Sequence, residues 1–371
     1  MDFGFTPEQE QLKSQVRRFL DSECPLERVR ELMRSDAPHD AELWRKAAEL
    51  GWHALIVPEA HDGLGLNWED VAVVAEEMGK SLCPLPFVSN AVAARAIDKL
   101  GSEDQKKRWL PAIAAGELIA TIAVIEPGDV HDESGITLEA KPDGDGVTIS
   151  GTKTFVADGQ SANLLLVAAR EKGGVSLFAV TTDAPGVTVM PLVLVDPTHK
   201  AAKIELDGVQ IAGADRLGEA GKAWPALSRV LDAGTVAESA LMVGAADSAV
   251  QLATEYAKVR KQFGHPIGRF QGIKHTLAEI YVGVESARSL TYYASWAVDH
   301  LDDAMRFVSM AKAYASETLD RAGEECIQIH GAIGFTWECD AHLFYKRGRY
   351  SRNLLGSPEY HHERVLTSQG L

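Results

Sequence analysis

The chain has 371 residues, of which 46% are hydrophobic and 24% charged, as in soluble globular proteins. The length suits two to three domains. Its net charge of −16 argues against a general binder of nucleic acid or anionic membranes, because such proteins need a basic face. The four cysteines form no CxxC pair and predict reduced thiols in a cytoplasmic protein. No apolar run approaches the roughly 20 residues that span a bilayer.

The first part of the chain, residues 1–118, is predicted to be a helical domain. Thr6, Pro7 and Gln9 form an N-cap, a proline at the first helical position and a capping-box glutamine. Apolar residues then recur at helical spacing in segments that end at glycines.

Residues 119–221 are predicted to form a small β domain, because β-branched residues gather there and the apolar periodicity shortens to two. Expected strands are 146–156, 164–169, 175–182, 187–195 and 202–206. From residue 222 to 371 the pattern is helical again, with long segments over 225–263, 271–300, 304–330 and 341–355. We therefore expect an α+β protein with an N-terminal helical domain, a middle β domain and a C-terminal four-helix bundle.

Two motifs in the last domain suggest a binding site. The first is Arg260-Lys261-Gln262-Phe263-Gly264, whose arginine can grip a pyrophosphate through its planar fork and whose phenylalanine can pack on a sugar or ring. The second runs from Gln328 to Gly334, where small residues let another group approach the backbone. The alternatives are a helix-end charge for Arg260, core packing for Phe263 and a helix C-cap for the glycine turn.

The helix–β–helix order together with these motifs resembles the acyl-CoA dehydrogenase family over nearly the whole chain. Supporting fragments are Gly151-x-Lys153-x-Phe155, Leu206-Asp207-Gly208-Val209 and Asp215-Arg216-Leu217-Gly218. The resemblance implies an FAD enzyme that removes an α-proton and a β-hydride from an acyl-CoA thioester. It also implies a dimer or tetramer that passes electrons to an electron-transfer flavoprotein.

By resemblance, eight residues bind the adenosine-pyrophosphate half of an FAD that belongs mainly to a neighbouring subunit. They are Arg260, Gln262, Phe263, Gln271, Gln328, Ile329, Gly331 and Ala332.

The sequence departs from the family pattern at the markers of the reaction centre. In the family pattern, two threonines place hydroxyls near the flavin. Here Ile125 and Ala157 occupy those two positions, so both hydroxyls are missing. Thr235 stands where an arginine usually serves the CoA end. The usual glutamate base is Leu355, and the position that a minority of members use instead is Gly234.

The reaction needs a base, because the α-proton beside a thioester is only weakly acidic. Glu238 lies one helical turn beyond Gly234 in an apolar stretch, and burial there would raise its pKa. The alternative is a solvated or hydrogen-bonded helix carboxylate. Glu359 is a weaker candidate, and the histidines at 330, 361 and 362 have no spacing that supports a metal site.

The lost markers belong to a site built within one subunit, whereas the kept motifs grip a neighbour's FAD. The leading hypothesis is therefore a partner subunit of a heteromeric acyl-CoA dehydrogenase, a heterotetramer of the kind associated with steroid side-chain breakdown. The second hypothesis is a self-sufficient homo-oligomeric dehydrogenase with Glu238 as a displaced base. The third is a related oxidase or flavin monooxygenase.

Overall fold

The computed structural model describes residues 5–371. Thr6 caps the first helix as expected: its hydroxyl accepts a hydrogen bond from Gln9 N, and the Gln9 side chain accepts one from Thr6 N. The helices that precede the sheets are α1 (Pro7–Glu23), α2 (Leu26–Met33), α3 (Ala41–Glu49), α4 (Trp68–Ser81), α5 (Phe87–Leu100) and α6 (Glu103–Ala114).

Packing divides the chain into two compact units. The first contains residues 1–34, 68–83 and 235–371, so that α1, α2 and α4 belong with the C-terminal helices. The second contains residues 35–67 and 84–234, so that α3, α5 and α6 belong with the sheets.

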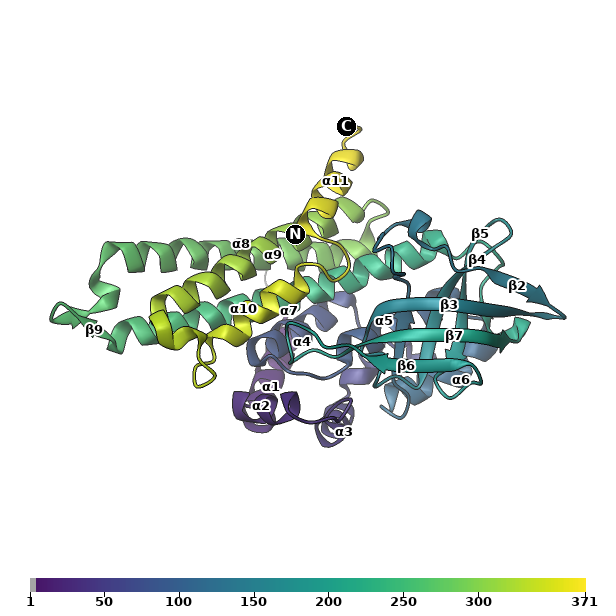
Figure 1. Ribbon diagram of the computed structural model, residues 1–371, viewed down its shortest axis with the longest axis horizontal. Helices are drawn as coiled ribbons and strands as arrows, with labels where there is room; N and C mark the ends of the chain where they lie inside the picture. The colour runs from purple at the N-terminus through teal and green to yellow at the C-terminus, as the bar shows by residue number, and fades with distance from the viewer. Residues whose placement is uncertain (1–4) are drawn as a thin grey trace. The chain divides into compact units, whose positions relative to one another are not determined.

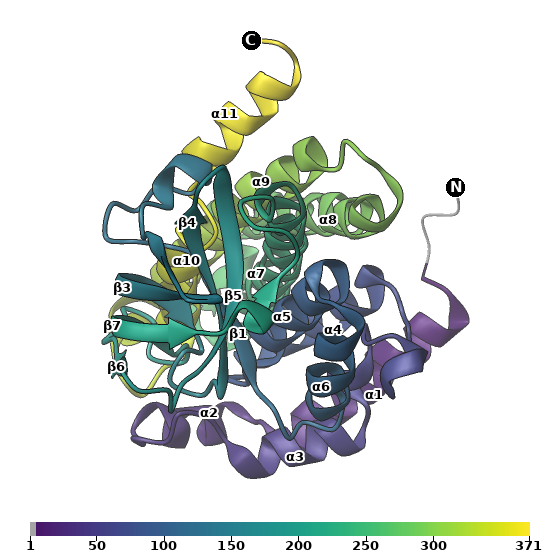
Figure 2. The same ribbon diagram turned by 90° about the vertical axis from the view of Figure 1, so that its right-hand side faces the viewer.

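The second unit holds two four-stranded sheets whose strands run crosswise in Figure 2. One sheet has the order β1-β4-β5-β8, built from Ala120–Ala123, Leu164–Glu171, Gly174–Thr181 and Arg216–Leu217. The other has the order β2-β3-β7-β6, built from Ala140–Asp143, Gly146–Ala157, Ala201–Ile211 and Val187–Pro191. Their facing side chains, including Ile149, Val167, Phe178 and Ile204, form one buried core.

Long helices form the first unit. α7 (Trp224–Val259) continues into it from residue 235 and lies alongside α8 (Gln271–His300) and α9 (Met305–His330) in Figure 1. α10 (Ala341–Ser351) and α11 (Pro358–Ser368) pack on α9. Small residues allow close helix approach: a Cβ on Gly244 would lie 1.9 Å from the Glu76 carbonyl oxygen of α4.

The order of helices, sheets and helices agrees with the predicted fold class, but several element ends differ. α7 ends at Val259 rather than Phe263, because Phe263 and Gly264 adopt positive φ. α10 ends at Ser351 rather than Leu355. The short elements α2, β1, β2 and α11 lie where the sequence predicted none. Among the described helices, none is long and apolar enough to cross a membrane.

Candidate functional site

A tight hairpin follows α7 and carries the first motif. Strand β9 (Lys261–Gln262) pairs with β10 (His265–Pro266), and the turn residues Phe263 and Gly264 have φ of 51° and 79°. Positive φ at both turn residues is what a type I′ hairpin requires. A bulky residue rarely adopts this conformation, and the Phe263 side chain is 89% exposed. Phe263 therefore presents its ring to solvent from a strained turn, where another molecule could contact it.

The second motif is the C-terminal end of α9. Gly331 is the C-cap with a φ of 68°, and its N–H donates to the carbonyls of Ile327 and Gln328. A Cβ at Gly331 would meet no atom within 4 Å, so its exposed backbone is open to a ligand. Gly334 has a different role, since a Cβ there would lie 2.8 Å from the Ile327 carbonyl oxygen. The helix C-cap and the open backbone are thus both present.

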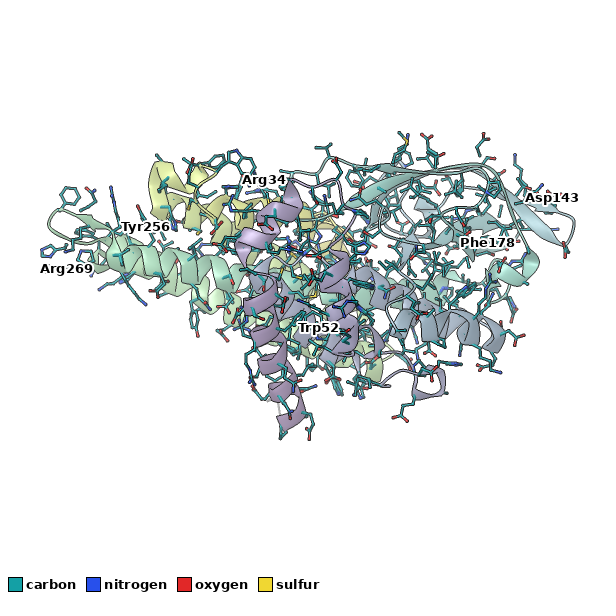
Figure 3. The ribbon with its side chains drawn as sticks, turned by 90° about the horizontal axis from the view of Figure 1, so that it is seen from below. Arg34, Trp52, Asp143, Phe178, Tyr256 and Arg269 are labelled. Atoms are coloured by element: carbon teal, nitrogen blue, oxygen red, sulfur yellow. The ribbon has the colours of Figure 1, made fainter. Side chains whose placement is uncertain are left out.

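An aromatic stack joins the two motifs. The rings of Tyr256, one turn before Arg260, and His330, next to Gly331, lie 4.2 Å apart with an interplanar angle of 26°. His330 Nδ1–H donates to the Cys326 carbonyl, which fixes the ring. Figure 3 shows Tyr256 and Arg269 at the same end of the helices. Sequence reasoning missed Tyr256, because a tyrosine at helical spacing gives no signal that separates it from core packing.

Seven of the eight predicted FAD contacts are exposed at this end of the bundle, and Ile329 is the exception at 6% exposure. Among the described residues, none forms an ion pair with the Arg260 guanidinium. Gln271 opens α8, where N–H groups of the first turn favour an anion. A free cation, a helix N-terminus and an open glycine fit the pyrophosphate half of FAD.

In the second unit, a buried ion pair supports the segment that resembles the family's flavin loop. Lys153 Nζ is fully buried and donates to Glu126 Oε1 at 2.7 Å and to the Val124 carbonyl at 3.0 Å. The Glu126 carboxylate also accepts from Leu138 N at 3.0 Å and from both the N–H and the hydroxyl of Thr137. This network holds residues 124–138 in place.

The residues beside that network lack the hydroxyls that the family uses near the flavin ring. Ile125 and Ala157 have no side-chain donor, and their backbone carbonyls accept from Thr154 N and the Thr121 hydroxyl. Phe155 lies at a register shift between β3 and β7, with a φ of 47° and 51% exposure. Of these three residues, Phe155 therefore offers an exposed aromatic ring, and none offers a side-chain hydrogen-bond donor.

Leu355, which the resemblance places at the family's base position, lies in the turn after α10. Leu355 has a φ of 59°, and its carbonyl accepts from His361 Nε2 at 3.0 Å. Lys312 Nζ, fully buried, donates to the carbonyls of Ser351, Arg352 and Gly356 at 3.1, 3.0 and 2.9 Å. Lys312 and His361 therefore hold the backbone of the turn in place. The side chain of Leu355 itself has no atom that can accept a proton.

Glu238, the candidate base, lies in α7 and is 2% exposed. Its carboxylate acts electrostatically on the Lys312 ammonium and raises the pKa of that lysine against the lowering caused by burial. Glu238 is thus buried, as the displaced-base hypothesis requires, and a buried cation that the sequence did not predict acts on it.

The chain belongs to the acyl-CoA dehydrogenase family. Residues 6–117 match the model of its N-terminal domain, residues 121–209 that of its middle domain and residues 221–369 that of its C-terminal domain. Family members are oxidoreductases that act on CH–CH bonds of acyl-CoA thioesters, and the expected reaction class, fold and FAD cofactor are confirmed at this level.

Among its relatives, acyl-CoA dehydrogenase FadE12 of Mycobacterium tuberculosis is 34% identical over 326 residues, which cover 85% of this chain and 84% of the relative. The solved structure of the ChsE4–ChsE5 complex from Mycobacterium tuberculosis matches with a TM-score of 0.92 and 28% identity, covering 100% and 99% of the two chains. A variant of the Tcur3481–Tcur3483 steroid ACAD matches with a TM-score of 0.89 and 31% identity, covering 98% of each chain.

Proposed function

We propose that this chain is the partner subunit of a heteromeric acyl-CoA dehydrogenase and completes the FAD site of a catalytic paralogue. One contrast carries the proposal. The end of the bundle that presents Arg260, Phe263 and the Gly331 turn is exposed and intact, whereas the base position is Leu355. A chain that retains binding groups without a proton acceptor at the usual position fits a supporting subunit.

Each binding residue has a distinct task in this proposal. Arg260 pairs with the pyrophosphate, and Phe263 packs on the adenosine. Gln262, Gln271 and Gln328 offer donors and acceptors. Gly331 and Ala332 let the phosphates approach the backbone, and buried Ile329 supports them by packing. When bound, FAD accepts the β-hydride of the acyl group, and the paralogue removes the α-proton.

The substrate class follows from the same proposal. The ChsE4–ChsE5 and Tcur3481–Tcur3483 proteins each carry two named chains, and the second is a steroid enzyme. We take a bulky, steroid-like acyl-CoA as the substrate, a cytoplasmic heterotetramer as the assembly and an electron-transfer flavoprotein as the acceptor. In such a heteromer, two subunits share one reaction centre instead of each having its own, which leaves room for a bulky acyl group.

The test compares the chain expressed alone with the chain co-expressed with a paralogue. We expect the lone chain to bind little FAD and to form no 2-enoyl-CoA with a dye acceptor, and the pair to do both. Stoichiometric FAD and turnover in the lone chain would contradict the proposal.

Arg260→Ala in the co-expressed complex tests the contact itself. We expect the affinity for FAD to fall at least ~10-fold, and with it the occupancy at limiting FAD, since a charge-assisted contact with a phosphate is worth about 1.5–3 kcal/mol. The matched control is Arg321→Ala, which removes an exposed arginine paired with Glu279 on the bundle surface. Equal occupancy in the two variants would rule out the role of Arg260.

The second candidate function is a self-sufficient dehydrogenase with Glu238 as its base, favoured by the burial of that carboxyl at 2% exposure. If it holds, Glu238→Gln abolishes the turnover of the lone chain while flavin stays bound. A lone chain without turnover removes this candidate.

A further inference from the structure

The turn over residues 351–356, which contains Leu355, is held by two buried side chains. Its carbonyls at Ser351, Arg352 and Gly356 accept hydrogen bonds from one ammonium, that of Lys312 on α9. The Leu355 carbonyl accepts from His361 of α11, which is itself fully buried. Four carbonyls at and just beyond the end of α10 thus accept hydrogen bonds from side chains instead of water.

Each donor is itself fixed by neighbours. Lys312 Nζ also contacts the Ser316 hydroxyl at 3.4 Å, and the His361 ring contacts the Ser309 hydroxyl at 3.2 Å through Nδ1. Both serines lie on α9 and are buried. The two donors therefore hold the turn rigidly on that helix.

The buried ammonium needs a counter-charge. Three charged groups act on Lys312: the carboxylates of Glu238 on α7 and Asp320 on α9 favour its protonated form, and the Arg352 guanidinium opposes it. Burial lowers the pKa of Lys312 to about 7, and Glu238 has the largest opposing effect. Asp320 is bonded to Arg352 at 2.9 Å, and Glu238 is the carboxylate that acts most strongly on Lys312.

We propose that Lys312 and His361 are positioning residues that fix the 351–356 turn, so that Leu355 presents an apolar side chain at a set place. Strain at Leu355, with its φ of 59°, is maintained by these contacts. The inference concerns the lone chain, so it stands or falls independently of the partner-subunit proposal.

The test measures hydrogen exchange of the full chain, with the urea midpoint as a second readout. Lys312→Met is expected to speed exchange of the amides of residues 352–357 at least tenfold and to lower the midpoint. Adding Glu238→Gln restores only part of the midpoint, since it removes the buried carboxylate that acts on Lys312 but leaves three carbonyls without donors. The turn stays unprotected in the double variant, because its carbonyls still lack donors.

A second pair of variants serves if Lys312→Met does not fold. His361→Gln keeps an N–H donor near the Leu355 carbonyl and is expected to retain protection, whereas His361→Leu is expected to lose it at least fivefold. The inference is overturned if protection returns in the double variant, if both His361 variants exchange alike, or if Glu238→Gln removes the turnover of an active lone chain without altering exchange in the turn.

Discussion

Two buried lysines, one in each compact unit, hold the two segments that the resemblance places at the reaction centre. Lys153 fixes the loop that contains Ile125, and Lys312 fixes the turn that contains Leu355. Both ammonium groups are fully buried. In both units a buried ammonium thus supports a segment in which Ile125 or Leu355 carries no polar side-chain group.

The two lysines differ in how their charge is balanced. Lys153 touches its carboxylate directly at 2.7 Å, and that carboxylate has further donors from Thr137 and Leu138. Lys312 instead directs its bonds to carbonyls and has Glu238 as an electrostatic neighbour. The loop in the second unit is therefore held by a shared network, whereas the turn in the first depends on one ammonium.

The largest expected effect is that of Lys312→Met. It leaves three carbonyls without a donor, and each buried acceptor left unsatisfied costs about 1–3 kcal/mol. Equilibrium urea unfolding measures this loss. Lys258→Met, at an exposed lysine paired with Glu255, is the control and should change stability by less than about 0.5 kcal/mol.

Lys153→Met should cost less, about 2–3 kcal/mol, because Glu126 keeps its bonds from Thr137 and Leu138. The same unfolding experiment ranks the two lysines. If Lys153→Met lowers the free energy of unfolding more than Lys312→Met does, the idea that the shared network tolerates loss of its lysine better than the turn does is wrong.

How far the sequence predicts these features depends on their range. Local patterns predicted the capping box at Thr6 and Gln9 and most helices and strands, because caps and periodicity are local signals. The two motifs of the last domain were also recognised from local residue types, and six of the seven exposed residues predicted to contact FAD carry polar or small side chains; their contact with FAD stays a prediction.

The supports of the turn were not predicted. Lys312 lies in the stretch Met310-Ala311-Lys312-Ala313, where a lysine among small and apolar residues is a signal similar to the one that drew attention to Glu238. Its acceptors lie about 40 residues further on, and only the tertiary fold brings them together. The sequence also did not predict the positive φ of Phe263 and Leu355, because bulky residues disfavour that conformation.

Acid should weaken the network of the second unit. Burial by itself raises the pKa of Glu126, but the hydrogen bonds from Lys153, Thr137 and Leu138 outweigh it and hold that pKa below the usual 4.5. The stabilising contribution is therefore complete above about pH 4.5 and is lost as pH falls through the lower folded-state pKa. Urea unfolding across pH 3–6 measures how the free energy of unfolding depends on pH. This free energy should change less with pH in Glu126→Gln than in the native chain, and an equal pH dependence would contradict the role of Glu126.

The smallest expected effect concerns strain in the two held segments. Phe155 and Leu355 both have positive φ, which costs a side chain with a Cβ about 1–2 kcal/mol, and asparagine tolerates this conformation better. Phe155→Asn should stabilise the chain by about 0.5–1 kcal/mol, because that side chain is half exposed and loses little burial. Leu355→Asn should be close to neutral, because relief of strain is offset by the loss of a partly buried leucine. Thermal unfolding of the two variants measures the difference, and a stabilised Leu355→Asn would mean that the turn gains nothing from its leucine.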